Sequence, residues 1–260
     1  MKLVYNYHTH TKRCGHATGE DEEYVISAIK YGIKRLAFTD HVMLPYVHEP
    51  KVRGDYSQIE DYLDSVKYLK EKYKDQIEIL VGFEAEYYDV FVDYYKWLLK
   101  EKVDFLILGQ HNYLDNYESR AYFQKDSPIE DIVHYTDDVV KGIESGLFKY
   151  VAHPDMLMYS QKEFTKEIEE QARRILSKCE EYNMPIEINI CGMRRPTWNG
   201  FSYGYPVHAF FELVKDYNLK VVLGIDAHDP SHFNQDDVDR AMEFVKLHGI
   251  KVEEDYYIDK

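Results

Sequence analysis

Two histidines separated by one residue, His8 and His10, follow a short apolar run near the start of the chain. The run Leu3–Tyr5 predicts a first β-strand, and residues two apart on a strand point to the same face. Neutral imidazole is a good ligand for zinc, iron and manganese, so two imidazoles on one face are suited to a divalent metal ion. Because an isolated pair of this kind is as often an incidental surface feature, the interpretation depends on similar residues elsewhere.

Similar side chains recur in the loop after this strand and at the carboxyl ends of later predicted strands. They are His16, Asp40, His41, Glu84, His111, His153, Asp226 and His228. Counting His8 and His10, seven of the chain's twelve histidines belong to this set. A catalytic zinc uses three protein ligands and a water, so the set implies two or three metal ions, which Glu84 could bridge. Closely spaced metal ions can share a hydroxide, a strong nucleophile at neutral pH.

The elements that would position these side chains alternate along the chain. Strands are expected at about 3–5, 35–39, 77–82, 105–109, 150–152, 185–190 and 220–225. Helices are expected at about 21–33, 57–74, 91–101, 127–146, 164–182, 206–217 and 235–247. Ser57 and Glu60 form a capping-box signature, and Ser127 before Pro128 is typical of another helix start.

Strict alternation of strands and helices predicts a parallel sheet with helices outside it, in a single domain over residues 1–260. Such a sheet can close into a barrel or stay open and doubly wound. Nearly every predicted strand carries a possible ligand at its carboxyl end. In a barrel those ends converge on one mouth, whereas in an open sheet they converge only where the strand order reverses. The barrel is therefore favoured.

Composition restricts the partners. The 260 residues carry a net charge of −15, which disfavours nucleic acid and anionic membranes as partners because no basic run is present. There is no signal-peptide pattern and no apolar run of roughly 20 residues. Three cysteines, Cys14, Cys179 and Cys191, are too few and too scattered for a disulfide framework. We expect a cytoplasmic protein that is a monomer or a small homo-oligomer.

Taken together, the motifs resemble the PHP (polymerase and histidinol phosphatase) superfamily. They are His8-Thr9-His10, Cys14-Gly15-His16, Thr39-Asp40-His41, Gly82-Phe83-Glu84, Gln110-His111, His153-Pro154-Asp155 and Asp226-Ala227-His228. The similarity is greatest to the L-histidinol-phosphate phosphatase branch, for which residues 11–16, 187–189 and 205–206 are the further matching features.

The resemblance implies a distorted (β/α)7 barrel with a site for three metal ions, which would be Zn, Fe or Mn. One ion would be held by His8, His10, Glu84 and Asp226. A second would be held by Glu84, His111 and His153, and a third by His16, His41 and His228.

The implied reaction is hydrolysis of L-histidinol phosphate to L-histidinol and orthophosphate, in histidine biosynthesis, by a metal-bridging hydroxide. Glu84 and Asp226 would serve catalysis as ligands. Arg194 and Arg195 are placed to bind the phosphate, with only one of the two expected to point inward, unless they lie in a solvated loop. Asp40 could act on a metal-bound water or the leaving group, or could instead fix a histidine tautomer.

Asp155 is expected to orient a neighbouring ligand and Glu86 to support Glu84. The loop residues Tyr46, His48, Tyr113, Tyr117 and Arg120 do not identify a pocket for an imidazole side chain.

Other functions remain open. A related PHP phosphoesterase acting on nucleotides, sugar phosphates or phosphotyrosine would share every ligand and differ in its loops. An amidohydrolase-like barrel is disfavoured by His16 and by the lack of a lysine at a strand end. A non-catalytic metal-binding module is disfavoured by the completeness of the ligand set.

Overall fold

A computed structural model describes residues 2–123, 127–159, 161–194 and 204–258. Its central strands pair in parallel, in the order β1-β2-β3-β4 and β7-β8. Their bounds are β1 (Tyr5–Asn6), β2 (Arg35–Phe38), β3 (Glu78–Ala85), β4 (Phe105–Leu108), β7 (Ile186–Asn189) and β8 (Val221–Gly224).

Two sets of backbone contacts complete the ring. Val151 pairs in parallel with both Leu108 of β4 and Ile186 of β7, and so takes the place of a strand between them. On the other side, the His10 N–H donates to the Ala227 carbonyl (2.9 Å), and the Ala227 N–H donates to the carbonyl of His8 (3.2 Å). The predicted seven-stranded parallel barrel is confirmed, although the strand expected at 150–152 pairs through a single residue.

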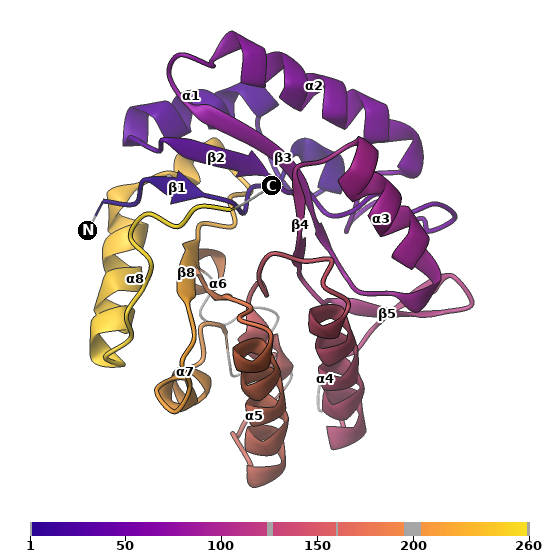
Figure 1. The fold of residues 1–260 in the computed structure, drawn as a ribbon, viewed down its shortest axis with the longest axis vertical. Coiled ribbons are helices and arrows are strands. Elements are labelled where there is room, and N and C mark those ends of the chain that lie inside the picture. Colours follow the sequence, from indigo (N-terminus) through magenta and orange to yellow (C-terminus); the bar gives the residue numbers. More distant parts are fainter. Residues whose placement is uncertain (1, 124–126, 160, 195–203, 259–260) are drawn as a thin grey trace.

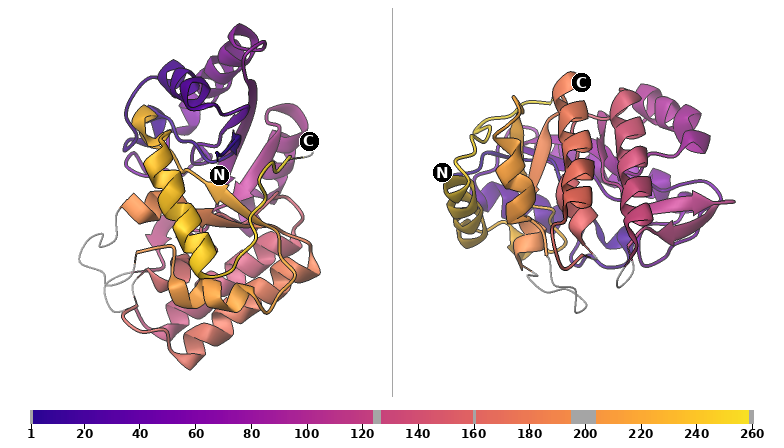
Figure 2. Two further views of the ribbon diagram at one scale, coloured as in Figure 1. Left: turned by 90° about the vertical axis from the view of Figure 1, so that its left-hand side faces the viewer. Right: turned by 90° about the horizontal axis from the view of Figure 1, so that it is seen from below.

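The helices lie outside this ring (Figure 1 and Figure 2). They are α1 (Asp21–Tyr31), α2 (Ile59–Lys72), α3 (Val92–Glu101), α4 (Ile129–Glu144), α5 (Lys166–Glu181), α7 (His208–Val214) and α8 (Gln235–Leu247). Amphipathic spacing explains their placement: α5 buries Ile168, Ala172 and Ile175 on one stripe. No helix in the part of the chain that the structure describes is long and apolar enough to cross a membrane.

Two predicted helix starts are wrong in detail. At α2 the capping box is formed by Asp55 and Gln58, around a 3-10 turn, and not by Ser57 and Glu60. Aspartate is a strong N-cap, so the chain begins to coil before Ser57. At α4 the hydroxyl of Ser127 donates to the Tyr122 carbonyl (3.3 Å), and Pro128 occupies the N-cap position.

Two elements at the mouth of the ring were not predicted. An antiparallel hairpin of β5 (Asn112–Asp115) and β6 (Glu118–Ala121) follows β4, and a short helix, α6 (Ile190–Arg194), follows β7 directly. The hairpin turns at Asn116 and Tyr117, whose φ values of 51° and 65° suit the twist of a two-residue turn. Glycine is the usual signal for such a turn, and it is absent here.

The residues after α8 close the opposite end of the ring. Val252 pairs with Val221 at the start of β8. The hydroxyls of Tyr5 and Tyr7 donate to the carbonyls of Glu253 (2.9 Å) and Tyr256 (2.8 Å). The amino ends of the strands are therefore covered by the C-terminal segment, and the carboxyl ends remain for chemistry.

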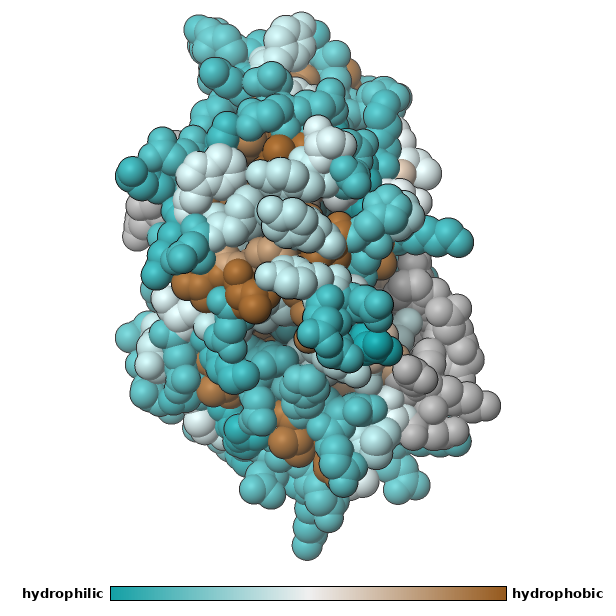
Figure 3. All heavy atoms as spheres, turned by 90° about the vertical axis from the view of Figure 1, so that its right-hand side faces the viewer, coloured by the Kyte–Doolittle hydropathy of each residue, from teal (hydrophilic) through white to brown (hydrophobic). Residues whose placement is uncertain are grey.

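The outer face over α3 carries apolar and aromatic residues among hydrophilic ones (Figure 3). Val90, just before α3, is 63% exposed, and Trp97 of α3 stacks on Tyr94 with ring centroids 5.7 Å apart. This face is formed by an outer helix, whereas the predicted ligands lie at the carboxyl ends of the strands.

Candidate metal centre

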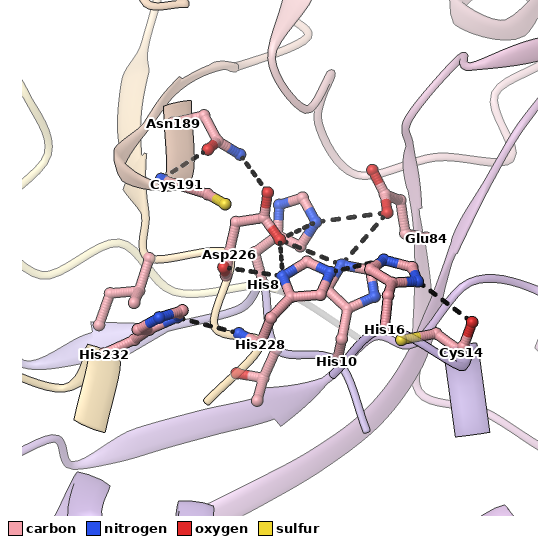
Figure 4. A network of polar contacts seen from close by, with 12 residues as sticks. His8, His10, Cys14, His16, Glu84, Asn189, Cys191, Asp226, His228 and His232 are labelled. Atoms are coloured by element: carbon pink, nitrogen blue, oxygen red, sulfur yellow. Dashed lines mark hydrogen bonds and ion pairs between the residues drawn. The ribbon is translucent and has the colours of Figure 1, made fainter. Parts of the chain in front are cut away.

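All nine predicted ligands meet at the carboxyl end of the ring. His8 and His10 flank Thr9, the residue whose pairing with Ala227 closes the barrel. Asp226 and His228 flank Ala227 itself, so closure of the ring brings the two pairs together. The His10 and His228 rings stack with centroids 4.1 Å apart (Figure 4). The ring centroids of His111 and His153 are 4.9 Å apart.

Glu84 lies at the centre of the cluster and is only 1% exposed. Its Oε2 is 3.2 Å from His41 Nδ1 and 3.4 Å from Nε2 of both His8 and His10. Its Oε1 is 2.8 Å from His153 Nε2 and 3.5 Å from His111 Nε2. A single carboxylate is thus surrounded by five imidazoles, as expected of a residue that bridges metal ions.

Asp226 is a second carboxylate in contact with several imidazoles. Its Oδ1 lies 3.1 Å from His10 Nε2, 3.2 Å from His228 Nδ1 and 3.6 Å from His8 Nε2. On the outer side, Nε2 of His228 is 3.0 Å from Nε2 of His16, which approaches from the loop after β1. The expected third ligand set therefore lies at the exposed edge of the cluster.

The donor set fits divalent metal ions. His8 Nε2, His41 Nδ1, Glu84 Oε2 and Asp226 Oδ1 are buried without a hydrogen-bond partner among the described residues. Leaving so many buried polar atoms unpaired is costly unless another group satisfies them. Ligand atoms lie within 4.8 Å of one another in the sets His8/His10/Asp226, His8/Glu84/His153 and His10/His41/His228. Imidazole and carboxylate together suit Zn, Fe or Mn.

The surroundings raise the pKa of some imidazoles in the cluster and lower the pKa of others. Burial opposes the charge on His10, but Asp226 and Asp40 outweigh it and raise the pKa of His10 to about 9. Burial and the neighbouring His228 instead lower the pKa of His16 to about 4. For Glu84, burial favours the neutral acid, yet the surrounding imidazoles hold its pKa well below the usual range. The carboxylate is therefore ionised and ready to bind a cation.

A buried carboxylate supports the far side of His8. Glu187 is fully buried, and its Oε1 lies 2.9 Å from His8 Nδ1. Its Oε2 accepts from the His153 backbone N–H (3.2 Å) and from Asn189 Nδ2 (2.8 Å). A Cβ at Gly224 would lie 1.7 Å from Glu187 Oε1, so the glycine leaves room for this carboxylate. The sequence signal was a glutamate within an apolar strand, which was used only as a family feature.

A second buried pair supports His111. Arg53 is 1% exposed and binds both oxygens of Glu86, at 2.8 and 3.0 Å. Glu86 Oε1 in turn lies 3.5 Å from His111 Nδ1. Glu86 was expected to support Glu84, but the structure places it against His111. Arg53 was not anticipated, because its partner is 33 residues away.

Asp40 occupies a supporting position. It is fully buried and accepts hydrogen bonds from the backbone N–H groups of Thr11 (3.2 Å) and His41 (2.8 Å) and from the Thr11 hydroxyl. Its Oδ1 lies 3.5 Å from His10 Nδ1. Asp40 is not among the residues that line the cavity described below, and its expected contact with a metal-bound water or the leaving group stays a prediction. The position fits the other expected role, which is to hold a histidine ring.

Asp155 also lies behind the ligands. Its Oδ2 accepts from the Val207 N–H (2.6 Å), and burial raises the pKa of this carboxyl to about 7. The contact joins the segment after His153 to the segment that precedes α7.

A cavity of about 350 Å³ opens on the cluster. Part of its lining consists of proposed ligands, including His10, Glu84 and Asp226. The remainder is mostly apolar and comes from loops and the hairpin: Val52, Ala121, Phe123, Met156 and Tyr159. None of Tyr46, His48, Tyr113, Tyr117 and Arg120 is part of the described lining.

A family model described as "PHP domain" matches residues 6–190. The chain belongs to the PHP domain family.

Relatives within the family share low identity over nearly the whole chain. A protein of Deinococcus radiodurans named "Probable histidinol-phosphatase" is 27% identical and is matched over 88% of each chain. The histidinol-phosphatase of Bacillus subtilis is 25% identical over 85% of this chain and 92% of that protein.

A solved PHP structure has the same fold. Histidinol phosphate phosphatase from Lactococcus lactis, complexed with zinc, L-histidinol and phosphate, superimposes with a TM-score of 0.71. The identity is 19%, and the match covers 96% of this chain and 95% of that one. The barrel predicted from the sequence therefore has a counterpart among experimental structures.

The expected phosphate ligand Arg194 faces away from the PHP site. Its Nε donates to Asp237 of α8 (2.7 Å), and its Nη1 and Nη2 donate to the carbonyls of Ile225 (3.1 Å) and His232 (3.4 Å). Its donors are turned toward α8 and the end of β8, and the residue does not line the cavity. In this arrangement Arg194 anchors α6, and its expected contact with the phosphate stays a prediction. Arg195 lies outside the described residues.

Proposed function

We propose that this PHP protein is a metal-dependent phosphatase that hydrolyses L-histidinol phosphate to L-histidinol and orthophosphate in the cytoplasm. The observation that carries the proposal is the ionised Glu84 carboxylate surrounded by five imidazoles at the mouth of a parallel barrel. Relatives named histidinol-phosphatase support the choice of substrate.

The metal ions would occupy three adjoining positions. His8, His10, Glu84 and Asp226 would hold one, Glu84, His111 and His153 another, and His16, His41 and His228 the third. Divalent ions bound there would activate water as a nucleophile and neutralise charge on the phosphoryl oxygens.

The chain's own residues prepare the site for this chemistry. Glu187 lies 2.9 Å from Nδ1 of His8, within hydrogen-bond distance, and so fixes that ring and its tautomer. Asp40 and Glu86 face Nδ1 of His10 and of His111, each at 3.5 Å, and place a negative charge beside these rings. Histidine rings that are already held in place need little rearrangement when charge develops in the transition state.

The cavity indicates a small substrate. Its 350 Å³ is at the lower end of the range for small-molecule sites. The apolar side chains of Val52, Phe123 and Met156 provide a surface for the organic part of a phosphate ester. An imidazole ring on a short chain suits such a surface, with its phosphoryl group directed to the cluster.

The test is a comparison of substrates with the metal-loaded enzyme. We expect kcat/KM for L-histidinol phosphate to exceed that for p-nitrophenyl phosphate, a nucleoside monophosphate, a sugar phosphate and phosphotyrosine by about 100-fold. Similar values across this panel would contradict the assignment and favour a PHP phosphoesterase of broader or different specificity. Glu84→Gln serves as the inactive control, with circular dichroism to verify its fold.

A further inference from the structure

One basic residue stands out in the lining of the cavity. Lys51, in the loop after β2, is the only lysine or arginine among the described lining residues. It is exposed, and its side chain forms no hydrogen bond or ion pair with another described residue. Many other lysines are paired, such as Lys102 with Glu60 and Lys178 with Glu144. In a chain of net charge −15, an unpaired ammonium at the cavity is available for an anion.

The backbone at Lys51 is held against the loop that carries His16. Gly15, next to His16, has φ +81°, and a Cβ there would lie 2.2 Å from the Pro50 carbonyl oxygen and 3.4 Å from the Lys51 Cα. Only glycine permits both this conformation and this close approach. The main chain of Lys51 is therefore packed beside the edge of the ligand cluster.

The same segment is fixed on its other side by Arg53. The Arg53 side chain binds Glu49 (2.6 Å), the Val42 carbonyl (3.0 Å) and Glu86, which contacts His111. The N–H groups of Val52 and Arg53 both donate to the Glu49 carbonyl, at 2.8 and 2.9 Å. The turn from Glu49 to Arg53 is thus anchored next to His16 and, through Glu86, to His111, while the ammonium of Lys51 is unpaired among the described residues.

We propose that Lys51 binds the phosphoryl group of the substrate, the role for which Arg194 was expected. Lysine acts on phosphate as a mobile point charge that donates charge-assisted hydrogen bonds. This inference specifies the phosphate contact of the proposed phosphatase and rests on that function for the reaction. The same contact should form with any phosphate monoester and with orthophosphate, which is the product.

Binding of orthophosphate to the metal-loaded protein tests the contact without any turnover. Lys51→Met keeps the apolar stem and removes the charge, and Lys51→Arg keeps the charge. Lys96→Met, at an exposed position on α3, is the matched control. We expect Lys51→Met to weaken orthophosphate binding, measured by calorimetry, roughly 10- to 100-fold, because a charge-assisted hydrogen bond is lost.

Several readouts separate this role from a structural one. In Lys51→Met the metal content and melting temperature should match the unmodified protein, and the dependence of phosphate affinity on salt should become shallower. Lys51→Arg should retain most of the affinity, and Lys96→Met all of it. For L-histidinol phosphate, KM should rise more than kcat falls.

Orthophosphate affinity in Lys51→Met equal to that of the unmodified protein would overturn the proposal, as would a failure of the unmodified metal-loaded protein to bind orthophosphate. A Lys51-dependent affinity without hydrolysis of L-histidinol phosphate would support the contact and reject only the proposed substrate.

Discussion

Glu187 Oε1 lies 2.9 Å from Nδ1 of His8, and both side chains are fully buried. The carboxylate fixes the proton of His8 on Nδ1, so that Nε2 is directed at Glu84 (3.4 Å) and Asp226 (3.6 Å). The two residues are 179 positions apart in sequence. This contact links β7 to the segment after β1 and gives the cluster a rigid support.

Replacing Glu187 by glutamine should lower metal affinity about 10- to 100-fold, the usual effect of losing such a partner of a ligand histidine. Competition with a chelator measures the affinity. Glu170→Gln, an exposed change on α5, should leave it unchanged. Equal affinity in the Glu187 and Glu170 variants would show that the carboxylate does not support the site.

Replacing Glu84 by glutamine should abolish phosphatase turnover and remove at least one metal ion per chain, because the neutral amide is a poor bridging ligand. Elemental analysis of the purified variant, compared with the unmodified protein, gives the stoichiometry. A full complement of metal in an active Glu84→Gln variant is the result that the bridging role does not allow.

The metal-free protein should lose stability from about pH 7 to pH 9. The carboxylates around His10 raise its pKa to about 9, so the stabilisation from its proton is complete below the ordinary value near 6.5 and disappears as the pH rises through 9. Metal binding needs the neutral ring, so added zinc should stabilise the protein more at pH 9 than at pH 7. The melting temperature is measured with and without metal at both pH values. A melting temperature of the metal-free protein that does not change with pH would contradict the charge assigned to His10.

Replacing Arg194 by methionine should lower the free energy of unfolding by about 2 kcal/mol, because Asp237 and two backbone carbonyls lose a donor. Affinity for orthophosphate should stay within about twofold of normal, since Arg194 faces α8. Denaturant unfolding and calorimetry provide the two values. A large loss of phosphate affinity with unchanged stability would restore the role expected from the sequence.

The barrel and the meeting of its strand-end residues could be predicted because their signals are local. Alternating apolar strands and amphipathic helices predict a parallel ring, and residues at strand ends such as Glu84 and His153 must then converge. The contacts of Arg194 could not be predicted, because the direction of its side chain depends on α6, a short helix that follows β7 without an intervening loop.

The partners of the supporting residues could not be predicted for a different reason. Arg53 with Glu86 and Glu187 with His8 are contacts between segments far apart in the sequence; the first depends on the pairing of β2 with β3 and the second on closure of the ring. The hairpin that supplies Ala121 to the cavity turns at Asn116 and Tyr117 without glycine, so its sequence carries only the weaker turn signal of an asparagine.

The central claim is that these side chains hold a cluster of metal ions around Glu84. Anomalous diffraction from crystals of the metal-loaded protein tests it most directly. We predict two or three peaks, each about 2.0–2.3 Å from imidazole nitrogens or carboxylate oxygens of the named ligands, with Glu84 shared between two of them. A cluster without such peaks, or peaks only elsewhere on the molecule, would contradict the account.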